Sequence, residues 1–354
     1  MIARMMAGAV KFLLAFMAPA TFLLGVWLGG AWTFLTVAYS YVAMPLLEPL
    51  VGYERGEAAG PAGPRRSALG RAILWSWLPM KAGLLIYALG LIASGVLSAL
   101  EIIGLTLSFG LISGGLSIVF AHELMHSPGR AERAMAEALM SSCTYTHFCI
   151  EHVAGHHRRV ATREDPASAR YGESLYAFVP RSVGGGLKSA WRIEKRRLEK
   201  KGLGLWNYQN RMLRYAAEVI ALYGLVIGFF GWAGGLFMLI QSYFAVSLLE
   251  TINYLEHYGL ERQRLEDGRY ERIGPQHSWD SGSRVTNWHT LNLGRHADHH
   301  GIASRPFEHL RLHPEAPQLP AGYSAMLLMA MVPPPWFHYM NPEVETWRKQ
   351  EKSA

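Results

Sequence analysis

Cysteine is almost absent from this chain, which has only Cys143 and Cys149 among its 354 residues. The two do not form a CxxC pair, and this shortage argues against a thiolate zinc site, an iron–sulfur module or a disulfide framework. A metal bound here must therefore be held by nitrogen and oxygen. The 15 histidines of the chain can provide the nitrogen.

Charged residues are also scarce, at 17% of the sequence, and the stretches between them include long apolar runs. A membrane-spanning helix needs about 20 mostly apolar residues. Six runs predict such spans, at residues 10–30, 32–51, 72–97, 100–121, 213–231 and 234–255. The fold prediction is therefore an all-α, polytopic integral membrane protein, a single domain over residues 1–354 with six transmembrane helices.

Lysine and arginine are missing from three of the predicted turns, near residues 29–30, 94–100 and 232–235. By contrast, loop 52–71 carries four arginines, and residues 130–214 are dense in both basic types. The positive-inside rule then places both termini and the polar segments 122–212 and 256–354 in the cytoplasm. We expect a multi-pass protein of the cell inner membrane. Its excess positive charge serves orientation and contact with anionic lipid, which leaves no reason to expect a nucleic-acid partner.

Four short clusters contain most of the histidines: HELMH, EHVAGHH, NYLEHYG and RHADHH. Their nine members are His122, His126, His152, His156, His157, His257, His296, His299 and His300. Spacings of three and four residues within the clusters would put the rings on one face of a helix. The topology, deduced without using histidine, brings all four clusters to one membrane face. Nine imidazoles there would suffice for two metals with four or five ligands each.

The residue types alone leave the metal open, because imidazole nitrogen suits zinc, copper, iron or nickel. HELMH also fits the HExxH pattern of zinc proteases, in which the glutamate, here Glu123, is a general base. That interpretation leaves the other clusters without a role, and four neutral ligands would saturate tetrahedral zinc. Iron accepts more ligands and keeps positions open for dioxygen. Paired nitrogen-rich sites beside an apolar helix bundle therefore favour oxygen chemistry on an apolar substrate.

The four clusters resemble the motifs of the membrane-bound, non-heme diiron alkane 1-monooxygenases, which belong to the histidine-box superfamily of fatty acid desaturases and hydroxylases. The family pattern HELxH matches residues 122–126, and EHxxGHH matches residues 151–157. NYxEHYG matches residues 253–259, and RHxDHH matches residues 295–300. The resemblance extends over nearly the whole chain, including the six spans. One departure is Ser127, which stands where the family usually has a basic residue.

This resemblance implies that the nine histidines bind two iron ions in a cytoplasmic diiron region that caps the spans. It implies terminal hydroxylation of a medium- or long-chain alkane with dioxygen and two electrons. The electrons would come from rubredoxin or a similar small carrier with its NAD(P)H-dependent reductase. The chain has neither a dinucleotide-binding fingerprint nor a cysteine cluster, so its electrons must arrive from outside.

Four carboxylates next to these histidines are expected to accept their second N–H, as carboxylates around ligating histidines usually do. They are Glu123, Glu151, Glu256 and Asp298. Asp165 is assigned instead to an ion network with Arg163 and Arg170, and His147 to a hydrogen-bonded role in the core.

Two alternatives remain open. One is a related diiron membrane hydroxylase or desaturase with an alkyl-aromatic (xylene-type) or fatty acyl substrate. The other is a histidine-rich metal transporter, which would need charged residues deep in the spans; Lys81, Glu101 and Glu250 are the candidates. The densest basic stretch, residues 188–201, is interpreted as a surface helix at the headgroup level, in preference to a docking face for an acidic electron carrier.

Overall fold

The computed structural model describes residues 8–54 and 66–353. Within these residues the regular structure is helical, and extended pairing is limited to isolated β-bridges. Five helices are long and apolar enough to cross a membrane: Gly8–Leu28, Gly30–Val51, Ala68–Ser94, Ala99–Met125 and Arg211–His257. The predicted all-α, polytopic membrane architecture is thereby confirmed. Most of the arginine-rich loop 52–71, residues 55–65 with Arg55 and Arg65, lies outside the described residues.

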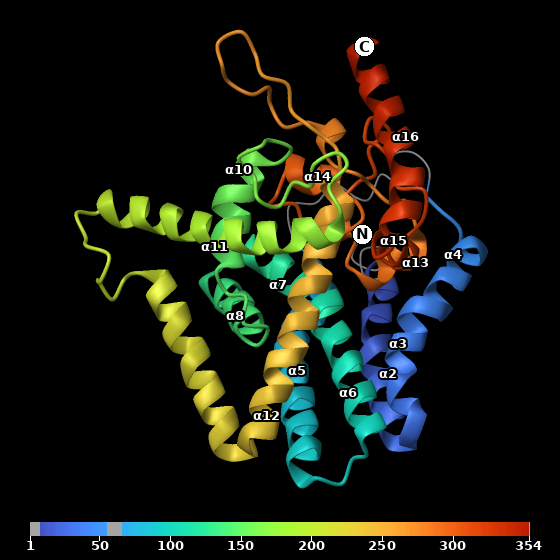
Figure 1. Ribbon diagram of the computed structural model, residues 1–354, viewed down its shortest axis with the longest axis vertical. Helices are drawn as coiled ribbons and strands as arrows, with labels where there is room; N and C mark the ends of the chain where they lie inside the picture. The colour runs from blue at the N-terminus through green and yellow to red at the C-terminus, as the bar shows by residue number, and fades with distance from the viewer. Residues whose placement is uncertain (1–7, 55–65, 354) are drawn as a thin grey trace.

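The last of these helices, α12 (Arg211–His257), accounts for two of the six predicted spans. At Gly231 its backbone has φ 69° and ψ −176°, a conformation that glycine adopts without a steric penalty. The chain turns back there (Figure 1). Residues 211–230 and 232–257 form two legs of about 30 and 39 Å, at ~1.5 Å per residue. Each leg is long enough to cross the apolar core of a bilayer, so the break at Gly231 makes the predicted turn.

The four preceding spans contain ten helical segments, of which eight come before residue 112. They are η1 (Lys11–Phe16), α2 (Met17–Leu28), η2 (Gly30–Phe34), α3 (Leu35–Ala38), η3 (Tyr39–Ala43), α4 (Met44–Val51) and α5 (Ala68–Ser94), with α6 (Ala99–Leu111) opening the fourth span. The fourth span continues without interruption through the π-helical η4 (Ile112–Ser117) and α7 (Ile118–Met125). It therefore includes His122 and ends directly before His126, beyond the predicted end at residue 121.

Local capping sets the bounds of the third and fourth spans. Ser67 accepts a hydrogen bond from the Gly70 N–H, and Ser98 forms a capping box with Glu101; both are favoured helix starts. Gly95, at φ 69°, ends α5 with a left-handed residue. For this reason the third span occupies residues 68–94 and not the predicted 72–97.

A hairpin of short helices lies between the legs of α12. It consists of α8 (Arg130–Ser141), α9 (Phe148–Glu151), η5 (His152–His156) and α10 (His157–Arg159). Its turn contacts the second leg, because Gln241 Nε2 donates to the Ser142 carbonyl at 2.8 Å and Thr144 Oγ1 lies 3.0 Å from Ser242 Oγ. Gln241 precedes His257 by sixteen residues, about 24 Å along a helix. Part of segment 122–212, expected to be cytoplasmic throughout, thus runs alongside the spans.

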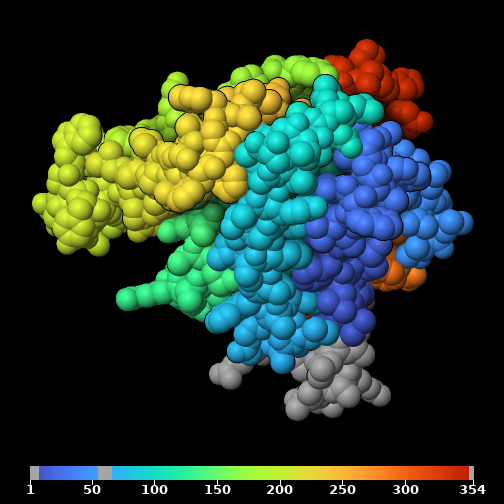
Figure 2. All heavy atoms as spheres, turned by 90° about the horizontal axis from the view of Figure 1, so that it is seen from below, coloured from blue at the N-terminus to red at the C-terminus, as the bar shows by residue number. Residues whose placement is uncertain are grey.

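Helix α11 (Leu175–Glu199) leads away from the bundle and joins the first leg of α12 through a loop. Together they form an arm that projects sideways (Figures 1 and 2). Lys195 lies near the outer end of this helix, and the basic stretch 188–201 occupies that outer part. The arm carries these basic side chains away from the histidine clusters, and the surface helix at the headgroup level stays a prediction.

Glu194 joins the two parts of this arm. The carboxylate is 1% exposed and accepts hydrogen bonds from the side chains of Arg197 and Arg211, at 2.6 and 2.7 Å. Burial raises the pKa of Glu194, but the hydrogen bonds from the two arginines outweigh burial and lower the pKa from 4.5 to about 2. The charged form is therefore the form that stabilises the arm.

Acid should weaken the Glu194 contact. A carboxylate with a lowered pKa contributes its full stabilisation above the unfolded-state pKa, near 4.5, and loses it as the pH falls through the folded-state pKa. We expect the unfolding temperature to be lower for Glu194→Gln than for the wild type at pH 7, by a few degrees, and the difference to vanish between about pH 4.5 and 2. Circular dichroism of both proteins in detergent measures this. A difference that persists at pH 2 would contradict the assignment.

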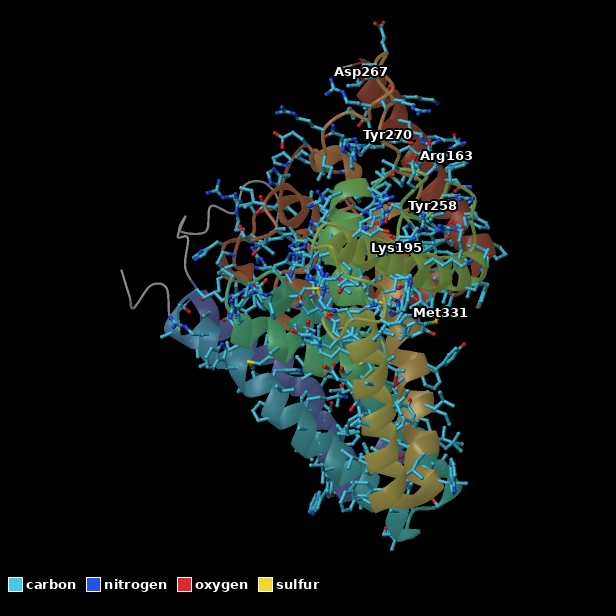
Figure 3. The ribbon with its side chains drawn as sticks, turned by 90° about the vertical axis from the view of Figure 1, so that its left-hand side faces the viewer. Arg163, Lys195, Tyr258, Asp267, Tyr270 and Met331 are labelled. Atoms are coloured by element: carbon cyan, nitrogen blue, oxygen red, sulfur yellow. The ribbon has the colours of Figure 1, made fainter. Side chains whose placement is uncertain are left out.

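The remaining segments cap the spans on the histidine side. They include η6 (Pro275–His277), α13 (Arg284–His289), α14 (His296–Gly301), η7 (Phe307–His309), α15 (Tyr323–Ala330) and α16 (Pro333–Ser353). Nitrogen- and oxygen-bearing side chains gather above the level of Met331, whereas the helices below carry mostly carbon (Figure 3). The buried α15 packs against α12 and is too short to cross a membrane.

Candidate metal centre

The nine predicted histidines converge into two groups. Ring nitrogens of five of them lie within 4.8 Å of one another, and we call this set the five-histidine group: His122, His126, His152, His157 and His299. The other four satisfy the same limit and form the four-histidine group: His156, His257, His296 and His300. The groups adjoin, since the rings of His157 and His300, one from each, have centroids 4.5 Å apart.

The division of EHVAGHH between the groups follows from its backbone. Residues His152–His156 form the π-helical segment η5, in which hydrogen bonds join residues five apart. This brings His157 Nε2 to 3.0 Å from His152 Nε2 and turns His156 toward the second group. The rings of His152 and His156 still stack, with centroids 5.3 Å apart, as their four-residue spacing predicts, but their ring nitrogens belong to different groups.

The ordinary helical spacing holds elsewhere. His122 and His126, at the end of α7, are in the same group, as are His296 and His300 in α14. His299, three residues after His296, points to the five-histidine group. Helix α14 thus contributes to both groups, while His257, the last residue of α12, adds a ring from the sixth span.

The ring nitrogens fit a bound cation. The Nε2 atoms of His122, His126 and His156 are buried and have no hydrogen-bond partner within the described residues. Burial and the neighbouring imidazoles lower the pKa of His126 to about 4, and they hold the pKa of His299 well below its usual value. Neutral imidazole is the form that binds metals. Buried neutral nitrogens that face one another without donors are what a pair of metal ions would satisfy.

Asp165 is the carboxylate that sequence reasoning missed. Its Oδ2 accepts a hydrogen bond from His156 Nδ1 at 2.8 Å and another from Ser168 Oγ at 2.7 Å. Both the imidazole and the carboxylate are buried, and the contact leaves His156 Nε2 facing the other histidines. The predicted ion network of Asp165 with Arg163 and Arg170 is wrong. No spacing rule pointed to this pair, because a turn after α10 separates the two residues.

Of the four predicted carboxylates, only Glu256 contacts a histidine of the two groups. Its Oε2 lies 3.3 Å from His296 Nε2, and its Oε1 accepts from the Tyr323 hydroxyl at 2.6 Å. The same His296 Nε2 lies 3.0 Å from His300 Nε2. Glu256 therefore contacts the nitrogen of His296 that faces another histidine, and not the second N–H of the ring, as was predicted.

The other three carboxylates bind arginine instead. Glu151 Oε1 accepts from Arg159 at 2.7 Å, and Asp298 accepts from Arg305 and from His313, which belongs to neither group. These contacts stabilise the segments that carry the histidines. His147 likewise lies outside both groups, and its buried Nε2 has no hydrogen-bond partner in the described part of the chain, contrary to the expected hydrogen-bonded role.

Arg66 explains the departure at Ser127. Its guanidinium donates to Glu123 Oε1 at 2.9 Å, to Ser127 Oγ at 2.8 Å and to Glu132 Oε1 at 3.1 Å. A positive charge therefore reaches the end of HELMH from loop 52–71, where other members of the resembling family have a basic residue in the motif itself. A contact across sixty residues has no local signal in the sequence.

One of two neighbouring apolar cavities reaches the histidines. The smaller, with about 340 Å³ of empty space, lies between the groups and is lined by His122, His152 and His296 together with apolar residues of η4 and α12. The larger has about 650 Å³ of empty space, including its open mouth, and lies between η3, η4, α12 and α15. Ile252 lines both cavities. Ile252 therefore lies between the larger cavity and the one that the histidines line.

The ionisable residues in the spans have local partners. Lys81 donates to Ser113 Oγ, and its ammonium lies 3.6 Å from the centre of the Phe109 ring. Glu101 caps its own helix, and Glu250 accepts from Tyr145 at 2.7 Å. Each contact fixes the charged or polar group inside the bundle. The three residues do not form the file of transit ligands that metal transport would need.

Comparison with known proteins places this arrangement among membrane enzymes. A family model of fatty acid desaturases matches residues 98–328. The chain is 39% identical to alkane 1-monooxygenase 1 of Pseudomonas aeruginosa, over 91% of this chain and 85% of the relative. It is 38% identical to the alkane 1-monooxygenase of Acinetobacter baylyi, over 88% of this chain and 76% of that one. The hydroxylase component XylM of the Pseudomonas putida xylene/toluene monooxygenase is 30% identical, over 92% and 86%.

Proposed function

The chain belongs to the fatty acid desaturase family and, within it, to the alkane 1-monooxygenases, and from this premise we propose that it hydroxylates the terminal carbon of medium- or long-chain n-alkanes. The observation that carries the proposal is the apolar cavity that ends between two groups of buried histidines. A ligand without polar atoms can enter such a cavity, and its end then meets the histidine side chains.

Nine histidines would hold two iron ions, one in each group. The partnerless buried nitrogens and the neutral state of the rings support this assignment. Bound iron would activate dioxygen for insertion into a C–H bond, as non-heme iron sites with open positions do. Asp165 would fix the tautomer of His156 by accepting its Nδ1–H, which keeps Nε2 free for the metal.

The chain's own side chains bind and orient the alkane. Burial in the two cavities is non-directional and worth roughly 0.8 kcal/mol per CH₂ group, so the cavities discriminate by length and shape. Ile252, Leu249 and Val119 line the approach to the histidines. These side chains hold the terminal carbon in place, and they exclude water from the site.

Electrons would come from a separate protein. The family requires an electron donor, and this chain has only two cysteines, which cannot bind an iron–sulfur cluster of its own. We assign rubredoxin, or a similar small carrier with its NAD(P)H-dependent reductase, to this role. The positive charge of segments 130–214 and of loop 52–71 supports a cytoplasmic histidine face and location in the cell inner membrane.

A reconstituted assay tests the proposal. The purified protein, rubredoxin and its reductase are supplied with n-alkanes from octane to hexadecane, and products are identified by gas chromatography. We expect primary alcohols only. Ile252→Trp should lower the turnover of hexadecane at least tenfold relative to the turnover of octane, because the larger ring separates the two cavities. Ile220→Trp, on an exposed face of α12, is the matched control.

Other products would contradict the proposal. Desaturated products without any alcohol would point to a desaturase, and selective turnover of p-xylene would point to an aromatic methyl hydroxylase. A purified protein that holds zinc and consumes no dioxygen on addition of alkane would exclude an oxygenase.

A further inference from the structure

The larger cavity has one polar wall that alkane binding does not use. Tyr39 of η3 and His289 of α13 both line it, and the Tyr39 hydroxyl lies 2.6 Å from His289 Nε2. The two residues are 250 positions apart and meet only at this cavity. Polar side chains in a lipid-facing apolar pocket are costly unless they have partners, so this pair is a built feature that the apolar substrate leaves unexplained.

The direction of the hydrogen bonds follows from the second ring nitrogen. His289 Nδ1 lies 2.7 Å from the Val285 carbonyl oxygen, which can only accept. Burial lowers the pKa of His289, so the ring is neutral with its proton on Nδ1, and Nε2 is an acceptor. The Tyr39 hydroxyl therefore donates to His289 Nε2, and its own oxygen keeps lone pairs that can accept a further hydrogen bond.

The neighbouring hydroxyl groups of Thr286 and Thr290 also donate their hydrogen bonds to protein acceptors. Thr290 Oγ1 donates to the Thr286 carbonyl at 2.8 Å, and Thr286 Oγ1 donates to Glu48 at 3.0 Å. Their donors are thus occupied, as that of Tyr39 is, so Tyr39 and Thr290 offer the cavity an acceptor and not a donor, while Thr286 Oγ1 already accepts from the Tyr323 N–H. The described lining contains no lysine or arginine, so a carboxylate buried there would have no counter-charge. A neutral group that can donate, such as an alcohol hydroxyl, matches this wall.

We propose that Tyr39 and His289 form a hydroxyl-binding subsite, which holds a long-chain primary alcohol with its methyl end directed past Ile252 toward the two histidine groups. The chain of the alcohol occupies the apolar remainder of the two cavities. The orientation rests on the proposed function, since it makes the far methyl carbon the reacting atom. The alcohol formed from an alkane then becomes a second substrate, held by the end that has already been oxidised.

The resulting reaction is a second terminal hydroxylation. One C–H bond of the methyl group is replaced by C–O, with the oxygen taken from dioxygen. The other oxygen atom leaves as water. This requires two protons, and it requires two electrons from the same external one-electron carrier. The product is an α,ω-diol.

Binding tests the subsite independently of turnover. The full-length, iron-loaded protein in phosphatidylcholine nanodiscs is titrated with n-dodecane and 1-dodecanol. We expect 1-dodecanol to bind about fivefold to tenfold more tightly than dodecane, the effect of one neutral hydrogen bond, and Tyr39→Phe to abolish this ratio. Tyr243→Phe, at an exposed position of α12, should retain it. A ratio of one in the wild type, or a ratio unchanged by Tyr39→Phe, would overturn the subsite.

Product analysis tests the orientation. With 1-dodecanol as substrate we expect 1,12-dodecanediol, and we expect Tyr39→Phe to lower the dodecanol-to-dodecane ratio of kcat/KM about tenfold. If the protein hydroxylates dodecane and binds dodecanol but forms no diol from it, the proposed orientation is wrong. If the wild type oxidises neither compound, the proposed function fails, and the binding ratio still decides whether the hydroxyl subsite exists.

Discussion

Replacing His156 with alanine is expected to abolish hydroxylation and to lower the iron content from two ions per chain to about one. His156 supplies one of the four rings of the four-histidine group, and its Nε2 is buried with no other partner in the described structure. Three rings and the adjacent Glu256 would leave that metal with an open, weakened site. The five-histidine group keeps its full set, so the remaining iron should stay bound.

Two control variants separate loss of a ligand from general damage. Arg159→Ala removes the contacts to Glu151 and Ser189 from the same segment but touches no ring of either group, and His338→Ala removes an exposed imidazole. Both should retain two irons. Iron is measured by mass spectrometry of the purified proteins. If His156→Ala kept both irons and its activity, the division into two groups would be wrong.

The second large effect is expected at Asp165. Asp165→Asn keeps the size of the side chain but removes the negative charge that His156 Nδ1 faces. Loss of such a carboxylate typically lowers metal affinity or activity by about 10–100-fold. We expect that range for the iron affinity of Asp165→Asn, measured by competition with a chelator of known affinity.

Asp298→Asn is the matched comparison for this variant. Asp298 also lies next to a histidine in the sequence, but its oxygens bind Arg305 and His313. Its replacement should lower the unfolding temperature and leave the iron affinity within about twofold. An equal loss of affinity in the two variants would mean that the carboxylates act through the fold and not through His156.

Sequence reasoning located the spans and the histidine clusters because both have one-dimensional signals. Apolar length identified the six runs, and the absence of lysine and arginine from three turns ordered them. The grouping of the histidines had no such signal. The sequence EHVAGHH gives no sign of the π-helical hydrogen bonds of η5, which bring His157 into the group of His152 while His156 joins the other group.

Long-range contacts account for the rest of what the sequence could not predict. Asp165 reaches His156 across a turn, and Arg66 reaches Ser127 from sixty residues away. The hairpin that follows α7 was expected to be cytoplasmic because residues 130–214 are dense in lysine and arginine. It packs beside the spans because Gln241 and Ser242 of α12 satisfy the polar groups of its turn, which lipid alone could not do.

Helix α14 has a consequence for how the protein is made. It gives His299 to the five-histidine group and His296 and His300 to the four-histidine group, so neither group is complete before residue 299 has been synthesised. Chains fold from the N-terminus as they emerge, and all six predicted spans precede this helix in the sequence. If the two groups hold iron as proposed, both ions would bind only after all six predicted spans have been synthesised. A chain truncated before α14 would insert normally but would have incomplete ligand sets for both metals.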